Sequence, residues 1–173
     1  NFEEEDVPIE ADNKLQVQKG EKLTGTYVDP SDDFGNVKTV TDIAFYGVSL
    51  ISGTISTDST WSKANSPYLI TGDVSITDST TLIIEPDVEV RFVAISDDQS
   101  SGDDNNRSEI RIEKGILRAM GSETDSIIFT SNSETPAAGD WYGIRVGNNN
   151  SSYNTTRAFL DYCRIEYNTY GLN

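Results

Sequence analysis

Acidic side chains crowd one polar stretch near the middle of the sequence. Residues 96–106 contain Asp97, Asp98, Asp103 and Asp104 and no large apolar side chain. Calcium takes about six to eight oxygen ligands, with carboxylates foremost, so these four aspartates are candidate calcium ligands. Their spacing does not fit the EF-hand loop, because the closing Glu and the fixed Gly position are absent. A solvated insertion that holds no ion is the alternative interpretation.

Arginine and glutamate alternate with apolar residues in several short segments that follow. Arg111 lies between two isoleucines and two glutamates, Glu109 being the first, and Arg145, Arg164 and Glu166 follow the same alternation. In a strand, alternate side chains face opposite sides, so these charges are expected on an outer face. They would form a shallow groove in which arginines grip an acidic sugar. Alternatively, they form a ladder of exposed ion pairs, each worth about 0–1 kcal/mol.

The residues that catalysis most often requires are scarce. The chain has no His and a single Cys, Cys163, which excludes His-based triads and leaves a Cys nucleophile without the histidine that would activate it. Alternation places Cys163 inward, as a small apolar side chain. Glycoside hydrolysis needs two carboxyl groups at a set separation, and nothing in the pattern brings Asp161 and Glu166 together. The residues therefore favour a protein that is not an enzyme and needs no cofactor, calcium excepted.

Charge and composition exclude several classes of partner. The 173 residues carry a formal net charge of −16, and nucleic-acid binding requires a basic surface. No apolar run approaches the roughly 20 residues of a membrane-spanning helix. An acidic chain rich in Ser, Thr and Asn and poor in Cys is typical of a protein that is extracellular or on the bacterial cell surface. Polysaccharides and other surface proteins are the partners that this chemistry leaves.

Three regions differ in their patterning. Residues 1–10 begin with an acidic run and predict a flexible leader, because like charges repel and little apolar surface is available to bury. Residues 11–57 contain short strand-like runs separated by turn signals, and are too few to bury a core alone. Residues 58–173 form the main repetitive region. We expect the small β segment of residues 11–57 to cap this region at its N-terminal end.

Similar strand patterns recur within the repetitive region. Leu82 aligns with Ile110 at an offset of 28 residues, and removal of residues 96–106 would reduce the period to about 20. Ile144 and Ile165 are separated by 21 residues. A period near 20 with two or three short strands per repeat predicts a solenoid, in which stacked turns about 4.8 Å apart bury one another's apolar faces.

The order of these segments resembles that of the right-handed parallel β-helix repeat proteins, the pectin-lyase-like superfamily, of the bacterial secreted or surface type. The resemblance covers residues 61–173, and Asp87 stands where the superfamily usually has Gly. It implies an all-β fold, a right-handed parallel β-helix of about four to five coils that is truncated at its C-terminal end. The segments that carry the resemblance are residues 68–76, 81–92, 115–121, 127–131, 140–146 and 160–167.

The superfamily includes polysaccharide lyases, glycoside hydrolases, adhesins and surface stalks, so the fold alone does not select a function. We expect a non-catalytic extracellular β-solenoid that serves as a scaffold, adhesive stalk or interaction module. One alternative is the N-terminal part of a polysaccharide lyase or glycoside hydrolase whose site lies in further coils. Another is an assembly subunit that pairs by strand addition, through the open solenoid end or the N-terminal strands.

Overall fold

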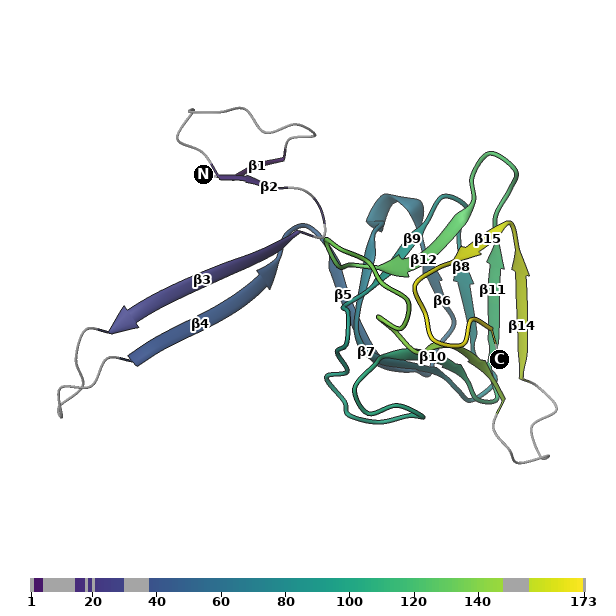
Figure 1. Ribbon diagram of the computed structural model, residues 1–173. Coiled ribbons are helices and arrows are strands. Elements are labelled where there is room, and N and C mark those ends of the chain that lie inside the picture. Colours follow the sequence, from purple (N-terminus) through teal and green to yellow (C-terminus); the bar gives the residue numbers. More distant parts are fainter. Residues whose placement is uncertain are drawn as a thin grey trace. The chain divides into compact units, whose positions relative to one another are not determined.

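The computed structural model describes residues 2–4, 15–17, 19, 21–29, 38–147 and 156–172 (Figure 1). The chain divides into two compact units, Asn1–Val48 and Ser49–Asn173. The described residues form β-strands and one 3-10 turn, Lys63–Asn65. No helix among them is long and apolar enough to cross a membrane.

The first unit contains two small two-stranded sheets. Strand β1 (Phe2–Glu4) pairs in parallel with β2 (Leu15–Val17), and β3 (Lys22–Asp29) pairs antiparallel with β4 (Lys38–Phe45). Strand β1 lies within the leader predicted for residues 1–10, whose other residues are outside the described part of the chain. A two-stranded hairpin buries little surface, and the β3–β4 hairpin accordingly leaves Tyr27 exposed.

The second unit consists of parallel strands that stack in three ladders. The first ladder follows the order β5, β7, β9, β12, β15, and the second the order β5, β7, β10, β13. Both belong to one sheet, because β5 and β7 are long enough to bend and take part in each. The third ladder follows the order β6, β8, β11, β14. The strands are β5 (Ser49–Ile55), β6 (Ser59–Trp61), β7 (Tyr68–Ile76), β8 (Thr81–Ile84), β9 (Glu89–Phe92), β10 (Glu109–Ile112), β11 (Ile116–Met120), β12 (Ile127–Ser131), β13 (Gly143–Val146), β14 (Arg157–Asp161) and β15 (Cys163–Ile165).

One apolar core fills the space between the ladders. Alternate side chains of the strands point inward, so that Val74, Ile110 and Ile144 form one stacked column of buried residues. At another corner the rings of Phe92 and Trp141 stack with centroids 3.8 Å apart. Burial of each such side chain stabilises the fold by about 1.5–3 kcal/mol, and because each coil buries its neighbours the core runs continuously along the stack.

These strands confirm the predicted all-β fold, a parallel β-helix, but the predicted stacking register is wrong. Leu82 pairs with Leu117, not with Ile110, and Ile110 pairs with Val74. Residues 81–92 and 109–120 share the pattern strand, turn, strand because each turns a corner, yet they turn different corners of the coil. The 21-residue interval between Ile144 and Ile165 is likewise not a stacking offset, since Ile144 bridges to Leu172 and Ile165 pairs with Phe129.

The length of a coil explains why the register is hard to predict. Ser59 pairs with Leu82, 23 residues later, close to the predicted period. Val74 pairs with Ile110, 36 residues later, because residues 93–108 are inserted between β9 and β10. Strand β5 also pairs with β7 inside the solenoid, whereas the sequence pattern assigns it to the preceding segment. The short alternation of apolar and polar residues in β5 is like that of the strands before it. Only its pairing with β7 shows that it belongs to the solenoid.

Candidate functional site

Two carboxyl groups lie side by side on the outer face of the second ladder. Asp73 and Glu109 precede Val74 and Ile110, which pair across β7 and β10. The backbone N–H of Glu109 donates to Asp73 Oδ1 over 3.1 Å. Only 2% of Asp73 and none of Glu109 is exposed. Buried neighbouring carboxyl groups are rare, because like charges in a poorly solvated place repel.

A loop from the same chain covers this pair. Residues 96–106, here called the acidic loop, place Ser101 and Asp103 over the two carboxyl groups. The Ser101 hydroxyl donates to Asp73 Oδ2 over 2.7 Å, and the Asp103 N–H donates to Glu109 Oε1 over 2.8 Å. Gly102 has a φ of +74°, and a Cβ there would overlap side-chain oxygens of both Asp73 and Glu109. Glycine therefore permits the close approach of the loop to the pair.

The four aspartates predicted as calcium ligands are engaged with protein groups. Asp97 accepts the backbone N–H groups of Asp73 at 3.2 Å and Ser101 at 2.7 Å, and Asp98 accepts the Thr71 hydroxyl at 2.7 Å. Asp103 pairs with Arg145 and Asp104 with Arg107, at 2.7 and 2.8 Å. Within the described ranges, no three Asp, Glu, Cys or His side chains are grouped so that they could hold a metal ion. Calcium binding by these aspartates stays a prediction.

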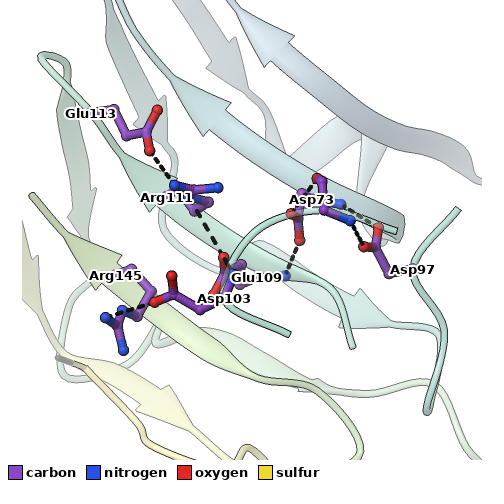
Figure 2. Close-up of polar contacts among 8 residues, drawn as sticks. Asp73, Asp97, Asp103, Glu109, Arg111, Glu113 and Arg145 are labelled. Atoms are coloured by element: carbon purple, nitrogen blue, oxygen red, sulfur yellow. Dashed lines mark hydrogen bonds and ion pairs between the residues drawn. The ribbon is translucent and has the colours of Figure 1, made fainter. Parts of the chain in front are cut away.

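Two arginines lie beside the carboxyl pair. Arg111 and Arg145 are register partners on β10 and β13. Figure 2 shows Arg111 between Glu109, 3.6 Å from its Nε, and Glu113, and Arg145 directed at Asp103. The Arg145 guanidinium carbon also lies 5.7 Å from the ring centroid of Tyr142. We call these two residues the arginine column.

The predicted ligand face is therefore only partly assembled. Arg111 and Arg145 are brought together, but Arg164 lies on β15 in the first ladder, opposite Ile128 of β12. It pairs with Glu166 at 2.9 Å. Arg164 and Glu166 thus form an ion pair on another ladder, and the four residues do not share one column.

Burial changes the acidity of the covered carboxyl groups. It raises the pKa of Glu109 to about 7, with the charges of Asp73 and Asp103 adding to the effect and the Asp103 N–H and Arg111 opposing it. Burial also raises the pKa of Asp73. Glu109 Oε2 is buried and has no hydrogen-bond partner among the described residues. Near neutral pH, Glu109 can therefore gain or lose a proton at little cost.

The carboxyl pair was not among the site residues predicted from the sequence. Alternation places Glu109 on the outer face, which is correct, but it predicts a solvated face, which is wrong because the acidic loop folds back over it. A local signal is present in the sequence. An acidic residue is followed by apolar, polar and Ile residues at 73–76 and again at 109–112, and the two motifs are the ones that stack.

The other reactive groups have separate partners. The Cys163 thiol lies 3.3 Å from the carbonyl oxygen of Ala119, and burial raises its pKa to about 11. The thiol therefore stays protonated at neutral pH and is a poor nucleophile. Asp161 accepts the N–H of Tyr162, whereas Glu166 pairs with Arg164.

Parallel strands stacked in three ladders around one apolar core define the chain's class, a parallel β-helix. The sequence profile of the pectate-lyase-like β-helix domain family matches residues 53–173. The chain belongs to this family. No curated protein and no solved structure matches it. The handedness and the number of coils expected from the resemblance stay predictions.

Proposed function

We propose that this β-helix domain is a non-catalytic extracellular module that serves as a surface scaffold or interaction domain. The observation that carries the proposal is that five of the seven arginines in the second unit are bound by carboxylates of the same chain. An acidic sugar would have to displace those internal partners before it gained any contact with the guanidinium groups. The pairs are Arg91 with Glu89, Arg107 with Asp104, Arg111 with Glu109 and Glu113, Arg145 with Asp103, and Arg164 with Glu166.

The surface chemistry supports the same proposal. A formal charge of −16 favours solubility and opposes unspecific association. Ion pairs along the ladders add little stability individually. They do place charge on the outer face, because the apolar residues of the alternating strands point inward and the polar ones outward. A rigid stack with a hydrated exterior is suited to display and spacing at a cell surface.

A polysaccharide-binding surface is the second candidate, on one specific observation. The rings of Tyr142 and Tyr170 meet edge to face with centroids 5.1 Å apart, and Arg145 lies beside Tyr142. Tyr170 is 57% exposed. Aromatic rings offer an apolar surface to a sugar ring, and an arginine offers paired donors to a uronate carboxylate.

Cleavage and binding assays separate these functions. The purified chain is incubated with polygalacturonate and with neutral polysaccharides, and both new reducing ends and unsaturated uronates are measured. We expect neither product. Product formation that is lost in Arg111→Ala would contradict the scaffold proposal and favour an enzyme.

Binding to the same polysaccharides is measured by calorimetry. If the second candidate is correct, Tyr170→Ala weakens binding about tenfold, while Tyr27→Ala, a change at an exposed tyrosine of the first unit, leaves it unchanged. Equal binding by the unmodified chain and both variants would exclude the Tyr142–Tyr170 surface.

A further inference from the structure

The acidic loop is attached by polar contacts alone. Its residues include no large apolar side chain, so nothing in it is anchored in the core. Its base is closed by the Ser108 N–H, which donates to the Ser96 carbonyl oxygen over 3.0 Å. Individual hydrogen bonds contribute little net stability, because water replaces them when they break. A loop held in this way, with its ends tied together, can open without disturbing the strands below.

Several of the loop's contacts meet at the Asp73–Glu109 pair, and Asp98 attaches the loop separately to Thr71. Ser101 binds Asp73, Asp103 binds Glu109, and Gly102 lies between these contacts and against both carboxyl groups. In addition Asp97 ties the Asp73 N–H to the loop. The loop is therefore held at the two buried carboxyl groups, Asp73 and Glu109, whose charged forms are destabilised most by the loss of water.

Charged groups face the pair from β7, β10, β13 and the acidic loop, whereas β5, which pairs with β7, contributes none beside Asp73. Strand β7 contributes Asp73 itself, and β10 contributes Glu109 and Arg111, with Glu113 directly after its end. The acidic loop adds Asp97 and Asp103, and β13 adds Arg145, whose guanidinium lies over the Tyr142 ring. Carboxyl groups outnumber guanidinium groups here, so a second negative charge within the pair is poorly compensated.

The closed loop occupies the arginine column. The Asp103 carboxylate is 2.7 Å from Arg145 Nη2, and the same residue's N–H is bound to Glu109. Release of Glu109 by the loop would carry Asp103 away from Arg145. Closure of the loop and neutralisation of the Arg145 charge by Asp103 are thus coupled.

We propose that the acidic loop is a hinged cover over the arginine column and that the Asp73–Glu109 pair is its latch. When the cover is closed, Asp103 neutralises Arg145. When it is open, water reaches both latch carboxyls and Arg145 loses its internal partner. This inference concerns control of access to the arginines, and it stands whether the module is a scaffold or binds polysaccharide.

Protonation of the latch carboxyls determines whether a change in pH opens or closes the cover. A protonated Glu109 relieves the repulsion within the pair, and the pKa of Glu109 near 7 places this change close to neutral pH. Opening exposes the pair to water, which favours the charged form, so a rise in pH favours opening.

Two glycines provide a matched test of the cover. Gly102 and Gly147 both have positive φ, +74° and +86°. Only a Cβ at Gly102 meets the latch, since no atom of the described residues lies within 4 Å of one at Gly147. Hydrogen exchange of the peptide containing residues 96–106 is followed by mass spectrometry. We expect Gly102→Ala to raise exchange there about tenfold or more, and Gly147→Ala to leave it unchanged. Exchange in β8 and β11 reports whether each variant is folded.

Chemical labelling tests whether opening uncovers the arginine. Phenylglyoxal should modify Arg145 several-fold faster in Gly102→Ala than in the unmodified chain. Arg164, which pairs with Glu166 away from the loop, serves as the internal reference and should not change. Ser101→Ala removes one latch hydrogen bond without adding volume and should have a smaller effect in the same direction.

Three results would overturn the proposal. The first is unchanged exchange of residues 96–106 in folded Gly102→Ala. The second is unchanged labelling of Arg145 when that exchange rises. The third is loss of protection in the unmodified chain on addition of EDTA alone, which would show that a cation, and not the carboxyl pair, holds the loop.

Discussion

Asp73 and Glu109 are 36 residues apart in sequence, yet the N–H of one donates to the carboxylate of the other across adjacent parallel strands. Their side chains are covered by the acidic loop, which lies between β9 and β10 in the sequence. This arrangement has a stability cost that depends on pH, because each carboxyl group leaves water in the folded state.

The first prediction is that the unmodified chain becomes less stable as pH rises from 5 to 8. Folding raises the pKa of Glu109 from 4.5 to about 7. Between these values the folded state binds more protons than the unfolded state, so the free energy of unfolding falls as pH rises and levels off above about 7. The expected loss, relative to Glu109→Gln, is about 2–3 kcal/mol.

Urea denaturation at pH 5, 6, 7 and 8 measures this difference. Glu123→Gln, a change at an exposed residue, is the control and should follow the unmodified chain. A pH profile of Glu109→Gln that coincides with that of the unmodified chain would show that Glu109 does not titrate as described.

The second prediction concerns the stacking register. Ile83 faces outward on β8 and pairs with Arg118 on β11, whereas the offset expected from sequence would place it beside Arg111. In a Cys163→Ala background, we expect mild oxidation to join Ile83→Cys to Arg118→Cys, because neighbouring Cα atoms in a ladder are within disulfide range. The pair Ile83→Cys and Arg111→Cys should remain reduced. A cross-link in the second pair alone would restore the sequence-based register.

The third prediction compares two phenylalanines on opposite faces of the strands. Phe129 is fully buried in the core, whereas Phe159 is 38% exposed beneath the Arg118 guanidinium. Phe129→Ala should lower the free energy of unfolding by about 3–5 kcal/mol, and Phe159→Ala by about 1 kcal/mol. Equal losses of unfolding free energy for the two variants in chemical denaturation would mean that Phe129 and Phe159 do not lie on the inner and outer faces as described.

The fourth prediction concerns the thiol. Burial raises the pKa of Cys163 from 9.0 to about 11, which lowers the thiolate fraction near neutral pH about a hundredfold. Alkylation by iodoacetamide at pH 8 should therefore be at least that much slower in the native chain than in urea. Comparable rates in both would show an accessible, ionised thiol.

Several features could be predicted from the residues themselves. Alternation such as that of Ile110, Arg111 and Ile112 determines which side chains face the core, because the period of a strand is two residues. The recurrence of such segments predicts a solenoid, and the resemblance to parallel β-helix proteins implies the parallel β-helix that the structure confirms. Trp141 is fully buried in this core, where its ring stacks on Phe92.

The tertiary structure decided which segments stack and which charges are buried. Equivalent alternation in β8 and β10 does not reveal that Leu82 lies beside Leu117, because register depends on where each corner of the coil falls. The sequence likewise marks residues 96–106 as polar, but a polar loop in solvent and a polar loop folded onto a carboxyl pair have the same composition. Glu109 became a buried, titratable group because a distant part of the chain excludes water from it.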